Sequence, residues 1–204
     1  MAKLGWIDKT PLGIYIHIPF CMKKCDYCDF LSFPATEQVR NQYVKQLITE
    51  LQVRSAGLKD CLIDTVFLGG GTPSVLEERQ IAEIMNTVQK YFSVDKEPEI
   101  TMEMNPKTVT KEKLNVCKDN GINRISFGVQ SFDDNYLKLL GRIHSVKDFY
   151  ENYDMARKIG FSNINLDLMS ALPGQKVSDI QKELKKAVEL SPEHISFYGL
   201  IIEE

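Results

Sequence analysis

Three cysteines near the start of the chain have a spacing that could bind a metal centre. Cys21, Cys25 and Cys28 follow a strand-like run and are separated by three and then two residues. Thiolate-rich sites favour zinc, Cu(I) or iron–sulfur clusters, and three ligands on one loop would leave the fourth iron of a cubane without a protein ligand. Structural zinc usually takes four ligands, and only His17 lies nearby as a fourth. Ordinary buried cysteines rarely cluster in this way.

Length and composition indicate one globular domain, which we expect to span residues 1–204. The chain is 43% hydrophobic and carries a formal net charge of −3, so it lacks the basic footprint of a nucleic-acid-binding protein. No apolar run reaches the ~18 residues of a membrane span, and Met1–Trp6 lacks the apolar core of a signal peptide. Five cysteines, three of them clustered, argue against a secreted disulfide scaffold. We therefore expect a cytoplasmic protein.

Strand-like and helical patterns alternate along the chain. The strand-like runs are Gly13–Phe20, Asp64–Leu68, Glu99–Asn105, Arg124–Gln130, Asn163–Met169 and His194–Leu200. The helical patterns are Glu37–Ala56, Glu77–Phe92, Lys111–Asn120, Val146–Ile159 and Val177–Leu190, with no sequence left for a sixth. Such alternation predicts an α/β fold with right-handed crossovers and a parallel sheet.

The predicted strands have one apolar face and one polar or small face. An ordinary β/α barrel fills its interior with Val, Ile and Leu. Here the inward positions are instead Glu103, Asn105, Gln130, Asn165, Asp167 and Tyr198. Unpaired buried polar groups cost about 1–3 kcal/mol each, so these residues indicate either a bound polar ligand in a lumen or a half-open sheet whose polar face meets solvent. In both cases they gather near the strand C-termini, where α/β sites form.

A glycine run follows the second predicted strand. Gly69, Gly70 and Gly71 remove every Cβ at the strand's end, which lets the backbone approach a ligand closely, and Thr72 adds a hydroxyl. The run is not a P-loop, because the Gly-Lys-Ser/Thr ending is absent. Taken alone it is a weak signal.

The cysteine spacing and the lead-in Tyr15–Phe20 together resemble the radical S-adenosylmethionine (SAM) enzymes. The more specific resemblance is to the branch that holds the oxygen-independent coproporphyrinogen III oxidases and the HemW-type haem chaperones. It implies a partial (β/α)6 TIM barrel, a 4Fe–4S cluster on Cys21, Cys25 and Cys28, and SAM on the open iron. The positions it assigns to SAM are Tyr15, Tyr27 (adenine), Gly70, Gly71, Thr72, Glu103, Gln130, Arg142 and Asp167. His17 would lie beside the cluster, or else simply pack in the barrel.

Three features favour the HemW side of this branch. The oxidases typically carry a further cysteine where this chain has Phe30, and the segments Leu140–His144 and Ala171–Gln175 also look HemW-like. The resemblance implies haem as a ligand and a small electron carrier such as flavodoxin or ferredoxin as a candidate donor. Relatives continue into a C-terminal region with a haem-associated His segment, so we expect a chain shortened at its C-terminus that binds haem weakly.

Two alternatives remain open at the level of sequence. One is a coproporphyrinogen oxidase that decarboxylates its substrate to protoporphyrinogen. The other is a non-enzymatic barrel whose cysteines hold zinc or a structural cluster. Outside the cysteine motif, we interpret Cys61 and Cys117 as small apolar residues, and His144 and His194 as surface or capping residues.

Overall fold

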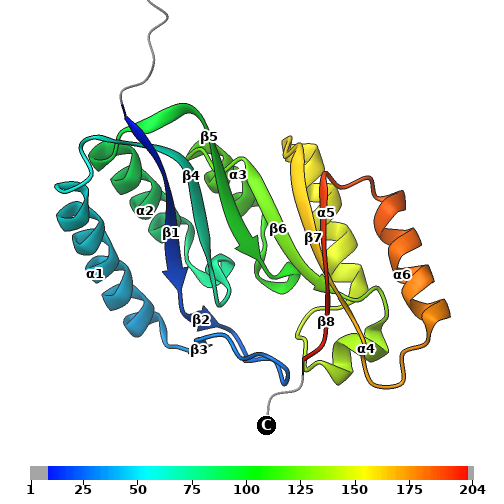
Figure 1. The fold of residues 1–204 in the computed structure, drawn as a ribbon. Coiled ribbons are helices and arrows are strands. Elements are labelled where there is room, and N and C mark those ends of the chain that lie inside the picture. The colour runs from blue at the N-terminus through cyan, green and yellow to red at the C-terminus, as the bar shows by residue number, and fades with distance from the viewer. Residues whose placement is uncertain (1–8, 202–204) are drawn as a thin grey trace, which may run out of the picture.

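A computed structural model describes residues 9–201, and its centre is a six-stranded parallel sheet (Figure 1). The expected domain ends at residues 1 and 204, and Met1–Trp6, lie outside the described residues. The strands run in the order β1 (Thr10–Ile18), β4 (Cys61–Gly70), β5 (Val94–Met104), β6 (Arg124–Gln130), β7 (Asn163–Ser170) and β8 (His194–Gly199). Each neighbouring pair is parallel, as the alternating pattern predicts.

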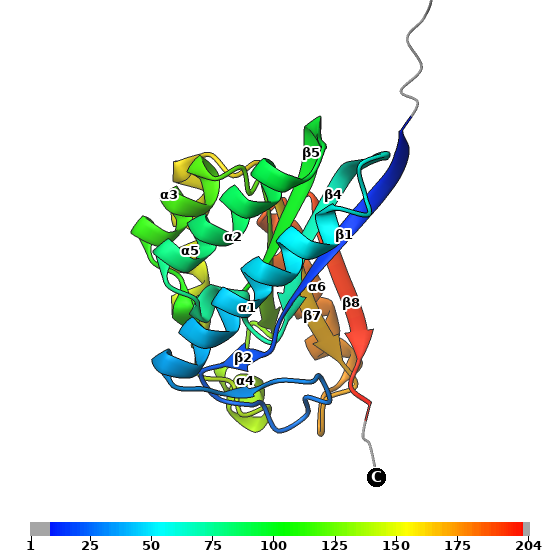
Figure 2. The same ribbon diagram turned by 90° about the vertical axis from the view of Figure 1, so that its left-hand side faces the viewer.

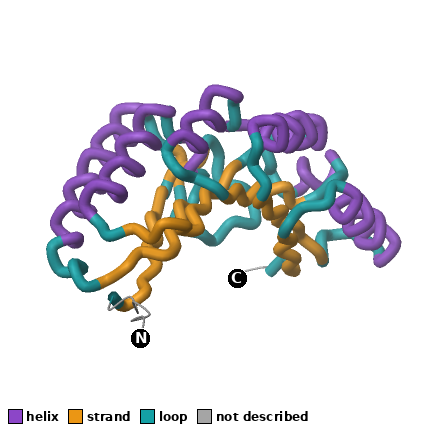
Figure 3. The backbone as a smooth tube through the Cα atoms, turned by 90° about the horizontal axis from the view of Figure 1, so that it is seen from above, coloured by secondary structure: helices purple, strands orange, loops and turns teal. Residues whose placement is uncertain are grey.

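Helices cover the convex face of the curved sheet, and the strands themselves form the surface of its concave face (Figure 3). The helices are α1 (Glu37–Ser55), α2 (Glu78–Tyr91), α3 (Lys111–Asp119), α4 (Asp134–Leu139), α5 (Val146–Ile159) and α6 (Val177–Glu189). The turned view shows α1, α2, α3 and α5 layered along one side of the sheet (Figure 2). Within residues 9–201, no helix is long and apolar enough to cross a membrane.

The apolar strand face predicted from residue alternation forms the core beneath the helices. Its members are Ile16, Ile18, Val66, Leu68, Ile100, Met102, Met104, Ile125, Phe127, Val129, Ile164, Leu166 and Leu168, all buried. They pack against Ile81, Ile84 and Met85 of α2 and against Phe149 of α5. Burying each such side chain contributes about 1.5–3 kcal/mol relative to exposure, so this interface dominates the stability of the fold.

Local signals set several helix ends. The side chain of Thr110 accepts a hydrogen bond from the backbone N–H of Lys113 at 3.1 Å and so caps α3. At the other end of a helix, Gly160 adopts φ 99° and terminates α5, in the left-handed conformation that glycine tolerates best. The start of α3 at Lys111 and the end of α5 at Ile159 both match the expectation from sequence.

The sheet is an open half-barrel, because β1 and β8 are its two edges. The expected apolar face of the last strand is only partly buried, since Phe197 on edge strand β8 remains 43% exposed. Three further details differ from the sequence expectation. β4 and β5 begin earlier than predicted, α4 was not anticipated, and a short parallel pair, β2 (Phe20–Cys21) with β3 (Phe33–Pro34), flanks the cysteine loop.

Candidate functional site

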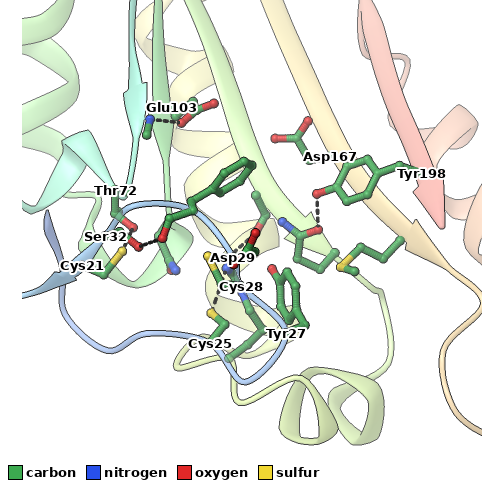
Figure 4. Close-up of a pocket in the computed structure, with 18 of the residues that line it drawn as sticks. Cys21, Cys25, Tyr27, Cys28, Asp29, Ser32, Thr72, Glu103, Asp167 and Tyr198 are labelled. Carbon is green, nitrogen blue, oxygen red and sulfur yellow. Dashed lines mark hydrogen bonds between the residues drawn. The ribbon is translucent and has the colours of Figure 1, made fainter. Parts of the chain in front are cut away.

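A cavity of about 550 Å³ opens where the parallel strands end. Its walls come from the cysteine loop and from the carboxyl ends of β4 to β8 (Figure 4). The cavity is lined by Cys21, Cys25, Tyr27, Cys28, Gly70, Gly71, Thr72, Glu103, Gln130, Arg142 and Asp167, among others. All the residues that the resemblance assigns to cluster or SAM therefore lie around one space, with the exception of Tyr15.

The cysteine loop joins β2 to β3 and is held at both ends. Phe33 N–H donates to the Pro19 carbonyl at 2.9 Å, and His17 Nε2 lies 3.1 Å from the Leu31 carbonyl. Because a carbonyl only accepts, His17 donates from Nε2. The His17 ring thus supports the loop that carries the cysteines, which is a structural role for this residue.

Two polar groups approach the cysteine sulfurs from other elements. Thr72 Oγ1 lies 3.4 Å from Cys21 Sγ, and Arg142 Nη1 lies 3.5 Å from Cys25 Sγ. Hydrogen bonds to sulfur stabilise thiolate character and tune metal centres. Cys21 and Cys25 thus each have one polar donor beside the sulfur.

The glycine run packs tightly against β1 and the start of the cysteine loop. A Cβ at Gly71 would lie 2.7 Å from the Phe20 carbonyl oxygen, and one at Gly70 would overlap the His17 ring. Gly70 also has φ 112°, a conformation that side chains rarely adopt. Close packing within the protein therefore explains these two glycines without any ligand.

Two carboxylates project into the cavity from β5 and β7 (Figure 4). Glu103 Oε2 accepts from the Gly70 N–H at 3.0 Å, and Asp167 accepts from Ser126 Oγ at 3.0 Å and from Asn165 Nδ2 at 2.8 Å. Burial raises the pKa of Glu103 to about 7, the Gly70 hydrogen bond opposes this, and the Asp167 charge adds to it. Glu103 and Asp167 are therefore held by different hydrogen-bond partners.

Gln130 and Tyr198 both line the cavity and are hydrogen-bonded to each other. Tyr198 Oη donates to Gln130 Oε1 at 2.8 Å, and burial raises the pKa of Tyr198 to about 12. Tyr27 packs beside Leu140, Met169 and Leu172 in a small apolar cluster. Burial also raises the pKa of Tyr27, so both phenols stay protonated near neutral pH.

Arg142 lies between the cysteine loop and the strand ends. Its Nη2 donates to the Gly128 carbonyl at 2.6 Å, while Nε is buried and has no hydrogen-bond partner within residues 9–201. Unsatisfied buried donors are rare in native structures. The Arg142 side chain as a whole lines the cavity, and its positive charge is suited to an anionic group of a ligand.

The structure places Tyr15 outside the cavity lining and corrects the interpretation of His144. Tyr15 is 60% exposed and stacks on Phe67 with 5.8 Å between the ring centroids, so its assignment to SAM stays a prediction. His144 is only 4% exposed, and its Nε2 donates to the Val129 carbonyl at 3.2 Å, so it is neither a surface residue nor a helix cap. Burial and the Arg142 charge lower the pKa of His144 to about 3, which keeps the ring neutral.

Cys117 lies outside the cysteine motif and is one of the two remaining cysteines. Cys117 is buried and its thiol lies 3.6 Å from Met102 Sδ, consistent with an apolar role. Burial raises the pKa of the Cys117 thiol to about 12.

Asp29 and Met169 line the cavity although sequence reasoning did not select them. Asp29 could have been found from its place next to Cys28. Met169 could have been found from strand alternation, because it shares the face of Asn165 and Asp167.

The described cysteines do not form a preassembled site for a single ion. Within residues 9–201, no three His, Cys, Asp or Glu side chains converge closely enough to hold one metal ion. In a cubane cluster, by contrast, each thiolate binds a different iron atom, so the sulfurs need not converge on one point.

The chain spans about half the length of the curated relatives that it matches. It is 40% identical to the haem chaperone HemW of Bacillus subtilis (strain 168) over 192 residues, covering 93% of this chain and 50% of the relative. It is also 40% identical to HemW of Escherichia coli (strain K12) over 198 residues, covering 97% and 52%.

Structural comparison leads to the same group of proteins. The coproporphyrinogen III oxidase HemN of Escherichia coli, described as a radical SAM enzyme, superimposes with a TM-score of 0.88 and 29% identity over 96% of this chain and 45% of that one. The archaeal Elp3 of Methanocaldococcus infernus, with a TM-score of 0.63 and 16% identity over 96% of this chain and 47% of that one, shares the fold. The profile of the radical SAM superfamily matches residues 15–187. The chain belongs to the radical SAM superfamily.

Proposed function

We propose that this chain is the radical SAM core of a HemW-type protein that acts in haem trafficking. Membership of the superfamily implies a 4Fe–4S cluster and SAM. The observation that carries the proposal is the shared cavity, in which the three clustered cysteines and the polar strand ends face one space. When bound together, cluster and SAM supply electron transfer to the sulfonium centre, and the chain's own residues bind and orient them.

Cys21, Cys25 and Cys28 are our proposed cluster ligands. They come from one loop, they face the cavity, and donors from Thr72 and Arg142 approach two of their sulfurs. Hydrogen bonds to the ligand sulfurs are one of the means by which proteins tune such clusters. The residues present therefore fit a cluster with one iron facing the cavity.

The cavity suits SAM in both size and polarity. A volume of about 550 Å³ lies within the ~300–1,000 Å³ of typical small-ligand sites. The carboxylates of Glu103 and Asp167 suit the ammonium group and ribose hydroxyls, and the guanidinium of Arg142 suits the carboxylate. Tyr27 offers an aromatic ring for the adenine. Gly70, Gly71, Thr72 and Gln130 complete the proposed pocket.

The zinc alternative has less support. A structural zinc site needs a closed tetrahedral set of four ligands, and the cysteine motif supplies three cysteines. The converging ligands that one ion requires are missing from the described residues.

The charge of the cavity lining favours HemW over an oxidase. Coproporphyrinogen carries four carboxylates, but among residues 9–201 the lining contains only Lys23 and Arg142 as cations, against Asp29, Glu103 and Asp167. An excess of acidic side chains would repel a tetra-anion. Phe30 also lines the cavity where the oxidases typically have a cysteine. The haem chaperone names of the curated relatives favour the same choice, with haem as the ligand. We propose the cytoplasm as the location.

Anaerobic reconstitution tests the cofactor assignment. We expect about four irons and four sulfides per chain, and loss of the brown chromophore in Cys21→Ala, Cys25→Ala and Cys28→Ala. Cys61→Ala and Cys117→Ala serve as matched controls and should keep it. Stoichiometric zinc with only trace iron would contradict the assignment.

Substrate assays separate chaperone from oxidase. Reconstituted chain with SAM and dithionite should leave coproporphyrinogen III unchanged, and haem added in a parallel titration should produce a bound-haem spectrum. Formation of protoporphyrinogen would overturn the chaperone proposal in favour of the oxidase.

A further inference from the structure

Gln130 occupies a strained turn at the edge of the cavity. It has φ 69° although it is not glycine, and the Ser131 N–H donates to the Val129 carbonyl at 2.9 Å across it. A three-residue turn with positive φ at its centre is a γ-turn of the rare, strained kind. The register of β6 on β7 also shifts between Gly128 and Gln130, as at a β-bulge that re-aims a side chain. The chain therefore departs from regular strand geometry at the residue that meets Tyr198.

A buried carboxylate from α6 holds the two residues that follow this turn. Glu183 is 6% exposed, and its two oxygens accept from Ser131 Oγ at 2.9 Å and from Phe132 N–H at 2.7 Å. One turn further along the helix, Lys186 Nζ donates to the Phe132 carbonyl at 3.0 Å. Both polar backbone groups of Phe132 are thus bound by side chains of one helix.

The residue before the turn is held from the opposite direction. The Val129 carbonyl accepts from His144 Nε2 in addition to Ser131 N–H. Strained backbone persists only where the surroundings over-determine it, at a cost of about 1–3 kcal/mol per residue. Contacts on both sides of Gln130 meet this requirement.

We propose that Glu183 is a positioning residue for Gln130, holding the γ-turn so that the Gln130 amide faces the cavity. A carboxylate is costly to bury, and an apolar residue would suffice if this side of α6 only packed against the sheet. Both carboxylate oxygens of Glu183 instead accept hydrogen bonds from Ser131 and Phe132, the two residues directly after Gln130. Its contribution to ligand binding rests on the proposed function, because it assumes that SAM occupies the cavity.

A double-mutant cycle in urea tests the positioning without any ligand. Glu183→Gln keeps the shape of the side chain but cannot accept from both donors, so it should lower the unfolding midpoint. Gln130→Gly allows positive φ without strain, so that background has no strain to release when Glu183 lets go of the turn, and the same change should lower the midpoint by more than it does in the parent. Ala171→Gly, at another non-glycine position with positive φ (57°), is the matched background and should show the same loss as the parent. Glu189→Gln, on the exposed face of α6, should have no effect.

The result that would overturn the proposal is an equal midpoint loss in the parent and Gln130→Gly backgrounds, which would make Glu183 an ordinary buried hydrogen-bonding residue. If Glu183→Gln does not fold, Ser131→Ala replaces it in the cycle, since it removes one of the two contacts to Glu183.

SAM titration of the reconstituted chain provides the second readout. Glu183→Gln should weaken SAM binding by up to about ten-fold, the effect expected when one neutral hydrogen bond from the Gln130 amide is lost, and should add little in the Gln130→Gly background. Equal weakening in both backgrounds would contradict positioning through Gln130. If the parent chain binds no SAM, the proposed function fails, whereas the urea cycle still decides the role of Glu183.

Discussion

Arg142 Nη1 lies 3.5 Å from Cys25 Sγ, although the two residues are 117 positions apart in the sequence. The same guanidinium donates to the Gly128 carbonyl at 2.6 Å. One side chain thus joins the cysteine loop to the end of β6, and its positive charge lies beside a proposed ligand thiolate. The cysteine loop and the polar strand ends are therefore physically coupled in the ligand-free chain.

Replacing Arg142 should weaken SAM binding. Arg142→Ala removes a charge-assisted contact worth about 1.5–3 kcal/mol, so calorimetry on the reconstituted chain should show a loss of affinity of ten-fold or more. Arg142→Lys keeps the charge but lacks the fork, and we expect an intermediate loss. Arg79→Ala, an exposed arginine on α2, is the control. Unchanged affinity in Arg142→Ala would mean that the SAM carboxylate binds elsewhere.

Glu103 should make stability depend on pH in a defined window. Burial raises its folded pKa to about 7, above the ordinary value of 4.5. The folded state therefore binds this proton more tightly than the unfolded state does, and the associated stability is complete below pH 4.5 and is lost as pH rises through about 7. The corresponding free energy is at most about 3 kcal/mol.

Urea unfolding of parent and Glu103→Gln at pH 5 and pH 8 measures this effect. The variant stays neutral, so its stability relative to the parent should increase from pH 5 to pH 8. Glu97→Gln, at an exposed carboxylate of β5, should show no such change. A constant difference between Glu103→Gln and the parent at both pH values would show that Glu103 does not titrate in this window.

Lys113 should be a large contributor to stability despite its charge. It is 8% exposed, and its Nζ donates to the Ser74 carbonyl at 2.7 Å and the Thr108 carbonyl at 3.1 Å, joining the turns that follow β4 and β5. Lys113→Met should lower the free energy of unfolding by about 1.5–3 kcal/mol. Lys182→Met, exposed on α6, should change it by less than about 0.5 kcal/mol. Similar values for both variants would disprove the role of Lys113.

Much of the layout was predictable from sequence, for a physical reason. Buried parallel strands need one apolar face against helices, and that periodicity is visible in segments such as Ile100–Met104 and Ile125–Val129. The same alternation identified Glu103 and Asp167 as cavity-facing. It does not decide whether Tyr15 reaches the cavity, because parity gives the face of a strand but not how far along the strand the cavity extends.

The polar contacts that support the site were not predictable. Lys113 and Glu183 lie on amphipathic helices, where a charged residue ordinarily faces solvent, and their partners are backbone groups of distant loops. His144 was misassigned for the same reason, since its partner, the Val129 carbonyl, leaves no mark in the sequence. Such contacts depend on tertiary packing rather than on any local pattern.

The central claim is that cysteines and polar strand ends form one site, and electron paramagnetic resonance of the reduced, reconstituted chain tests it most directly. Adding SAM should change the cluster signal of the parent, because SAM would bind at the iron that lacks a cysteine ligand. In Asp167→Asn the cluster should still form, but the change should require a higher SAM concentration. A normal cluster signal that stays the same at saturating SAM in the parent would contradict the account.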